Sequence, residues 1–378
     1  MQLILHPVVE ELAKLIETNN WHGHFEEAIK TAHNKNVPFL EQVTTLNSYL
    51  EWINNFLYWV PTETSSGNNV NDHLSAFYFI ADQSPLLRLQ NKIEPLDKAA
   101  PLTPFSKWLV DYANALGLFL DLPESLTKES EKSLYDTPYY NMNEYVRPHG
   151  GWHSFNQVFA RHFKPGYRPI AAVTDQTVIV MPADSTFGGQ WEIRKDSHVT
   201  LKKINWKISE LLEGSPYKDR FDNGMFMHSY LGPTDYHRQH APVGGRVLEA
   251  RVIQGQVYLE VEAVEENPGV HNINLKRSYD SLDTPGYQFA QTRGLFVLDT
   301  PIGLFAVLPI GMCQVSSVIL TAEVGVTVRK GEELSYFQFG GSDIIVLFEG
   351  SSNVCFSARQ AVHYKMGTKI AQAYPVIE

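Results

Sequence analysis

Two patterns of hydrophobic positions divide the chain. Up to about residue 140, apolar side chains recur every three or four residues, the spacing of amphipathic helices. The segments with this spacing are 6–19, 25–35, 38–60 and 104–122. Pro61, Pro101 and Pro104 punctuate them. The pattern predicts a helical amino-terminal region whose apolar stripes pack against one another.

From about residue 170 onward, apolar and polar positions alternate instead. The alternating runs, rich in Val, Ile and Phe, are 177–184, 246–264, 294–311, 314–328, 333–339 and 343–350. A period of two indicates strands, and the turn residues between the runs favour an antiparallel sheet or sandwich. Helices are expected at 153–163, ahead of the strands, and at 202–214, among them.

These patterns predict an α+β fold with two domains. Residues 1–140 form a helical domain, and residues 150–378 form a β-rich, antiparallel, sandwich-like domain. A chain of 378 residues with 43% hydrophobic residues is long enough to bury a full core without a metal or disulfides.

Charge and cysteine content narrow the classes of function. A formal net charge of -11 disfavours nucleic acid or an anionic membrane surface as the main partner. Two cysteines, Cys313 and Cys355, give neither a disulfide framework nor zinc spacing, which fits the reducing cytoplasm. The apolar stretch 303–312 is about half the roughly 20 residues of a spanning helix. We expect a cytoplasmic protein without a transmembrane segment, and its oligomeric state stays open.

The stretch 227–247, "MHSYLGPTDYHRQHAPVGGRV", holds the most unusual composition. His237 and His240 are three residues apart and can share one site, where Asp235 can orient either ring. A zinc site is disfavoured, because neither a nearby cysteine nor an obvious third ligand accompanies the two histidines. A pair of structural histidines in a loop is the alternative.

A serine, a histidine and a carboxylate suggest nucleophilic chemistry. Asp184 follows a predicted strand, where a carboxylate can point into a cleft, although a turn or capping role is the simpler interpretation. Ser342 follows Gly340 and Gly341, which leave the carbonyl of Gly341 uncovered for attack by the serine hydroxyl. With His240 as base, Ser342 and Asp184 complete a candidate triad for cutting the chain itself.

Four sequence blocks occur in an order that resembles a known family. They are 154–170 ("SFNQVFARHFKPGYRPI"), 181–185 ("MPADS"), 233–247 ("PTDYHRQHAPVGGRV") and 330–342 ("KGEELSYFQFGGS"). Together they resemble the phosphatidylserine decarboxylase family of self-processing, pyruvoyl-dependent decarboxylases. The likeness spans roughly residues 150–365 and identifies the chain as a carboxy-lyase of that family.

The resemblance implies a role for each candidate residue. Cleavage between Gly341 and Ser342 gives a large chain and a small chain that begins with a pyruvoyl group made from Ser342. Asp184 matches the family's carboxylate, and His240 matches the base of self-cleavage. His237 matches the histidine that the family uses near the pyruvoyl for decarboxylation. The substrate amine forms a Schiff base with the pyruvoyl, and the carboxylate leaves as CO₂.

Two departures from the family pattern bear on the substrate. Asp343 follows the serine where phospholipid-acting members usually carry threonine, and Ser185 replaces the glycine after Asp184. The long helical front is similar to the soluble branch that includes fungal L-tryptophan decarboxylase, where F-G-G-S also occurs. We therefore expect a free amino acid, such as L-tryptophan, as the small-molecule substrate, in preference to a lipid head group.

Three alternatives stay open at this point. The first is a phosphatidylserine decarboxylase that makes phosphatidylethanolamine. The second is an unprocessed serine hydrolase using Ser342, His240 and Asp184, although no G-x-S-x-G elbow surrounds the serine. The third is a scaffold that never matures, for which Asp343 is the only hint.

Overall fold

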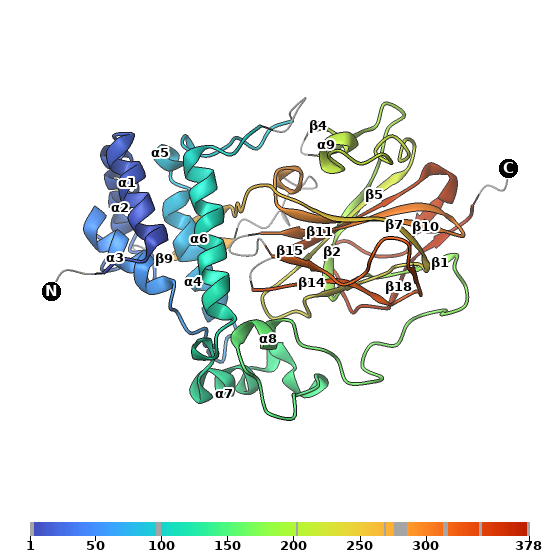
Figure 1. Ribbon diagram of the computed structural model, residues 1–378, viewed down its shortest axis with the longest axis horizontal. Helices are drawn as coiled ribbons and strands as arrows, with labels where there is room; N and C mark the ends of the chain where they lie inside the picture. The colour runs from blue at the N-terminus through green and yellow to red at the C-terminus, as the bar shows by residue number, and fades with distance from the viewer. Residues whose placement is uncertain are drawn as a thin grey trace.

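Most helices of the amino-terminal part gather on one side of the molecule, and most of the strands lie on the other (Figure 1). The structure is a computed structural model that describes residues 4–95, 100–201, 203–267, 270–275, 286–312, 317–339 and 342–375. Gly340 and Gly341, on the amino side of the expected cleavage point, lie outside the described residues, as does Cys313. Ser342 is described.

The helices fall mainly in the amino-terminal part. Their bounds are α1 Pro7–Thr18, α2 His22–Asn34, α3 Leu46–Phe56, α4 Asn69–Ala81, α5 Ser84–Leu87, α6 Pro104–Leu120, α7 Lys128–Asp136, α8 Phe155–Phe159 and α9 Ile208–Leu211. The long helix α6 begins where the sequence predicts, because Thr103 caps it by accepting a hydrogen bond from the amide of Ser106 at 3.2 Å. Pro104 then occupies the first turn, where a missing amide hydrogen costs nothing.

An eight-stranded antiparallel sheet dominates the rest, in the order β13-β7-β10-β11-β15-β5-β2-β17. Smaller sheets have the orders β1-β18-β16, β12-β14-β6, β3-β4 and β8-β9. The strands are β1 Val178–Val180, β2 Ser185–Glu192, β3 His198–Leu201, β4 Ile204–Lys207, β5 Met225–Leu231, β6 Arg238–His240, β7 Gly245–Ile253, β8 Val261–Asn267, β9 Val270–Leu275, β10 Arg293–Thr300, β11 Gly303–Gly311, β12 Val318–Leu320, β13 Thr327–Val328, β14 Glu333–Phe337, β15 Ser342–Phe348, β16 Val354–Phe356, β17 His363–Tyr364 and β18 Lys369–Ala373. The α+β prediction is confirmed.

Four local features differ from the prediction, and one of them is the helix expected at 153–163, of which only Phe155–Phe159 is helical. The helix expected over 38–60 begins only at Leu46, where Thr45 and Ser48 form a capping box. Helix α4 was not predicted. Segment 202–214 is mostly not helical, because residues 204–207 pair with β3 as a hairpin and only the four-residue α9 follows.

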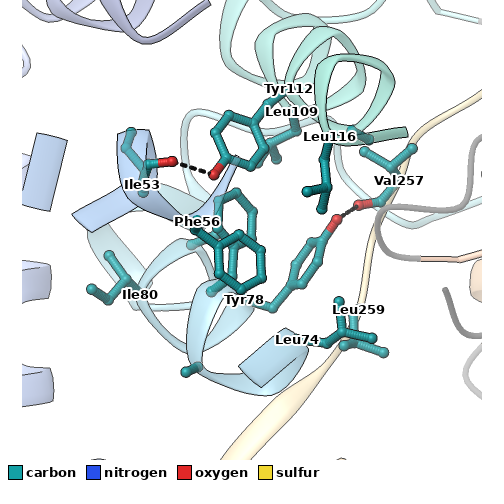
Figure 2. Packing of buried hydrophobic residues seen from close by; sticks show 14 of the residues in the cluster. Ile53, Phe56, Leu74, Tyr78, Ile80, Leu109, Tyr112, Leu116, Val257 and Leu259 are labelled. Atoms are coloured by element: carbon teal, nitrogen blue, oxygen red, sulfur yellow. Dashed lines mark hydrogen bonds between the residues drawn. The ribbon is translucent and has the colours of Figure 1, made fainter. Parts of the chain in front are cut away.

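One hydrophobic core joins the helices to the β-rich part. Figure 2 shows Tyr112 of α6 donating to the carbonyl of Ile53, and Tyr78 of α4 donating to the carbonyl of Val257, at 2.6 and 2.8 Å. Each such bond contributes about 1 kcal/mol. The same core cluster includes Phe339, just before the expected cleavage point. The domain boundary between residues 140 and 150 stays a prediction.

The strand β15 lies in the middle of the large sheet and is buried along its whole length. Ile344 packs in one core cluster, and Ile345 packs in another on the opposite face. The strand is held by backbone pairing to β11 on one side and β5 on the other. A cut before Ser342 therefore leaves the small chain anchored in the sheet.

Among the residues that the structure describes, no helix combines the length and the apolar character needed to cross a bilayer.

Candidate active site

The strands β2, β5 and β15 bring two of the predicted site residues, Asp184 and Ser342, to the same end of neighbouring strands in the large sheet. Ser342 pairs with Leu231 of β5, and Thr186 of β2 pairs with Tyr230, the neighbour of Leu231. Asp184 directly precedes β2. Neighbouring strands lie about 4.8 Å apart, so the backbones of Ser342 and the start of β2 lie about 10 Å apart, across one intervening strand.

Ser342 is fully buried at the first position of β15. Its hydroxyl oxygen has no hydrogen-bond partner within the described part of the chain. Ser197, Ser229 and Ser352 share this property, so it is the place of Ser342 at the expected cleavage point that makes its free hydroxyl a candidate reactive group. The orphaned oxygen fits a serine that is consumed to make a pyruvoyl group.

Asp184 is held by a buried ion pair. Arg168 donates to both of its carboxylate oxygens, with the Nε contacts at 2.9 and 3.0 Å, and the amide of Met366 donates to Oδ1 at 2.7 Å. Arg168 also pairs with Glu144 at 2.7 Å and lies over the ring of Phe163 at 3.8 Å. The carboxylate orientation is therefore fixed by partners other than a histidine.

The backbone of His240 lies close to that of Asp184, because the His240 amide donates to the carbonyl of Pro182, two residues before Asp184, at 2.7 Å. Its Nδ1 lies 2.9 Å from the carbonyl oxygen of Gly331, which can only accept, so Nδ1 carries the proton. Its Nε2 then accepts from the hydroxyl of Tyr236 at 2.9 Å. The ring presents a basic Nε2 to Tyr236 instead of Ser342.

Burial sets the protonation state of His240. Desolvation lowers its pKa from the ordinary value of 6.5, while the Gly331 carbonyl and the charges of Glu333 and Asp184 raise it in part. The ring is consequently neutral at pH 7, the state in which an imidazole takes up a proton. Asp184 acts on His240 through its charge and without a hydrogen bond between the two side chains.

Self-cleavage should depend on pH with a midpoint below 6.5, if His240 is its base. The neutral ring is the active form, so its fraction is full above its folded pKa and falls about tenfold per pH unit below it. We expect a constant cleavage rate from about pH 8 to pH 7 and a decline only in more acidic buffer. Following freshly made precursor on denaturing gels measures this profile. A midpoint above 6.5 assigns the base to another group.

His237 lies in a drier environment than His240. Its ring stacks on Phe159 of α8 at 3.8 Å, and neither ring nitrogen has a hydrogen-bond partner within the described residues. Burial lowers its pKa well below 6.5, and the charge of Arg161 lowers it further. The backbone carbonyl of His237 accepts from the amide of Phe337, so the histidine lies beside the strand that leads to Ser342.

A cavity of about 520 Å³ opens beside α8, and its lining does not include Asp184, His237, His240 or Ser342. Its lining includes Trp152, Arg161 and Arg238, together with Gln338 just ahead of the expected cleavage point. The buried guanidinium of Arg161 donates to the carbonyls of Thr234 and Asp235 at 2.7 and 3.2 Å, which leaves its charge uncompensated by these bonds. The guanidinium is therefore committed to the protein's own backbone, and the aromatic lining of the cavity comes from Trp152 and Tyr336.

The family model for phosphatidylserine decarboxylase matches residues 155–372, more than half of the chain. The chain belongs to this family. All four candidate residues, Asp184, His237, His240 and Ser342, fall within the matched region. The phosphatidylserine decarboxylase family is a family of carboxy-lyases. Its place in the soluble branch stays a prediction.

Curated relatives carry the same family name. A phosphatidylserine decarboxylase proenzyme of Fusobacterium nucleatum is 32% identical over 244 residues, covering 64% of this chain and 74% of the relative. Proenzyme 3 of Schizosaccharomyces pombe is 36% identical over 210 residues, covering 55% of this chain but only 20% of the relative. Proenzyme 2 of Oryza sativa is 30% identical over 209 residues, covering 55% and 31%. The chain thus spans less than a third of the two eukaryotic relatives.

Sequence reasoning missed the residues that hold the candidates in place. Arg168 fixes the carboxylate of Asp184, and the hydroxyl of Tyr236 donates a hydrogen bond to Nε2 of His240. The sequence analysis assigned no role to either residue. Both lie in the sequence blocks that carry the family likeness, which was the available signal. The hydrogen bonds do not link Ser342, His240 and Asp184 into a triad, and their roles stay predictions.

Proposed function

We propose that the chain is a proenzyme that cuts its own Gly341–Ser342 bond and then decarboxylates phosphatidylserine. Family membership supports the reaction class, and the proenzyme names of the relatives support processing. The observation that carries the proposal is the buried Ser342 hydroxyl, which has no partner among the described residues. Ser342 lies at the same end of the strands as Asp184, and it is close in sequence to the strand beside His237.

The proposed self-cleavage begins with proton transfer from Ser342 Oγ to Nε2 of His240, after Tyr236 releases that nitrogen. The oxygen adds to the carbonyl carbon of Gly341, the C–N bond breaks, and an ester replaces the amide. A base then removes the Cα proton of residue 342 as the bond between Cβ and the ester oxygen breaks, which frees the Gly341 carboxylate and leaves a dehydroalanine that tautomerises to an imine. Hydrolysis releases ammonia and leaves a keto group at the start of β15.

A pyruvoyl group at this place supplies an electron sink for the pair left behind by departing CO₂. The strand β15 would hold it, between β11 and β5. His237, neutral and dry, is suited to manage the proton that returns to the substrate carbon. Phe159 fixes its ring, and the stacked, buried pair excludes water from it.

The substrate preference differs from the one drawn from sequence. We expected a free amino acid such as L-tryptophan, but the named relatives favour phosphatidylserine. We therefore propose the lipid as substrate and phosphatidylethanolamine as product.

Release of CO₂ from two substrates tests this choice. With the processed protein, phosphatidylserine in detergent micelles should give at least about 100-fold higher kcat/KM than L-tryptophan, which lacks the phosphodiester. Ser342→Ala protein serves as the blank. Turnover of L-tryptophan but not of phosphatidylserine would contradict the lipid as substrate, while the decarboxylase reaction would still be supported. Turnover of neither substrate by fully cleaved protein would remove both.

A further inference from the structure

Asp343 and Ser342 are neighbours that face opposite sides of the large sheet. Successive residues of a strand point to opposite faces, and Ile344 and Ile345 pack in different core clusters. Ser342 thus shares the face of Ile344, and Asp343 shares the face of Ile345. The carboxylate is fully buried, on the face away from the reacting serine.

Three side chains hold one oxygen of this carboxylate. Oδ2 of Asp343 accepts from Nε2 of His228 at 2.9 Å, from the hydroxyl of Tyr287 at 2.5 Å and from the amide of Gln288 at 3.3 Å. His228 comes from β5, and the other two come from the short helix η4 (Tyr287–Phe289). We call these four residues the Asp343 cluster. His228 and Gln288 are as buried as Asp343 itself.

The backbone beside the cluster leaves room for the histidine. A Cβ at Gly188, in the neighbouring strand β2, would come within 2.7 Å of Nδ1 of His228. The ring can therefore occupy its place because residue 188 is glycine. A buried carboxylate is costly unless several donors satisfy it. Donors from two elements, β5 and η4, converge on Oδ2 of Asp343, while its Oδ1 has no partner among the described residues.

We propose that Asp343 is a positioning residue that fixes the end of β15 and thereby the group made from Ser342. The inference rests on the proposed function. Before cleavage, the chain on both sides of Ser342 restrains it. After cleavage, residue 342 is the amino terminus of the small chain. Its backbone pairs with Gly311 of β11 and Leu231 of β5 are then the last pairs of the two ladders, and strands fray at such ends. The hydrogen bonds of the Asp343 cluster hold residue 343, directly after this terminus, and so prevent the fraying.

Asp343 should consequently matter more for decarboxylation than for cleavage. In Asp343→Ala the three donors lose their acceptor and the terminus is free to move. We expect kcat per cleaved chain to fall about 100-fold, with KM within about twofold, because a displacement of about 1 Å suffices for such a loss. Asp343→Asn keeps the shape and one acceptor, so it should lose only about tenfold. Cleavage should still go to completion in both.

Glu349 provides a matched control at the other end of β15. Its carboxylate accepts from Arg220 at 2.6 Å and from the amide of Leu304 at 2.8 Å, so Glu349→Gln also weakens an anchored strand end. This control should keep kcat within about twofold of the unsubstituted protein. Melting temperatures of all variants show whether the losses in stability are comparable.

The outcomes separate this inference from the proposed function. Absence of cleavage or of turnover in the unsubstituted protein would count against the proposed function. Normal turnover there, together with the same kcat for Asp343→Ala and Glu349→Gln, would overturn the positioning role alone. A change in KM with unchanged kcat would also overturn it. Should Asp343→Ala fail to fold, Asp343→Asn decides by the same comparison.

Discussion

Ser342→Ala should yield one uncut chain of 42.9 kDa with no decarboxylase activity. Alanine removes the oxygen that attacks Gly341, so neither the ester nor the keto group can form, and turnover should fall by at least about 1,000-fold. The fold should survive, since the hydroxyl has no partner within the described residues and its loss breaks no hydrogen bond there. Denaturing gels, intact mass and CO₂ release measure the three properties.

Ser229→Ala is the matched control for this substitution. Ser229 lies on the adjacent strand β5 opposite Ile344, is fully buried, and also carries a hydroxyl without a partner among the described residues. It should cleave and turn over normally. Two fragments from Ser342→Ala protein would show that the bond cut is a different one. Cleavage lost in both variants would point to a packing effect and not to a nucleophile.

Local signals predicted those parts of the fold that are specified by nearby residues. Helix α6 has a regular apolar stripe, a threonine cap and an early proline, and all three agree. Helix α4 was missed because its carboxyl-terminal half is buried on every side, so that no polar face marks its period. Segment 202–214 was misjudged because pairing with β3 outweighs its own helical spacing.

In the candidate site, too, the sequence predicted some residues and missed others. The order of the sequence blocks pointed to Asp184, His237, His240 and Ser342 without any structural information. The partners of Asp343 could not be found from the order of the blocks, because His228 is 115 residues away in sequence and Tyr287 is 56 residues away. Asp343 stood out only as a departure from the family pattern. Its buried contacts offer a physical reason for a carboxylate at that position.

The two histidines should fail in different ways when replaced. His240→Ala removes the base next to Asp184, and we expect the precursor to stay uncut. His237→Ala leaves His240 with its Gly331 and Tyr236 contacts, so the chain should still cut itself. The product should then decarboxylate about 100-fold more slowly or worse, the usual loss when a positioned acid is removed. Cleavage on gels and kcat per cleaved chain distinguish the two defects.

The environments of the rings explain why the roles divide this way. His240 has a proton on Nδ1 and a basic Nε2, which can take the Ser342 proton once Tyr236 releases that nitrogen. His237 has no such partner among the described residues, stacks on Phe159 and lies beside the strand that leads to Ser342, so it is left for the later step that the family likeness assigns to it. Asp184→Asn should resemble His240→Ala, because it removes the charge that supports that ring. If His237→Ala stayed uncut while His240→Ala matured, the assignments of the two histidines would be reversed.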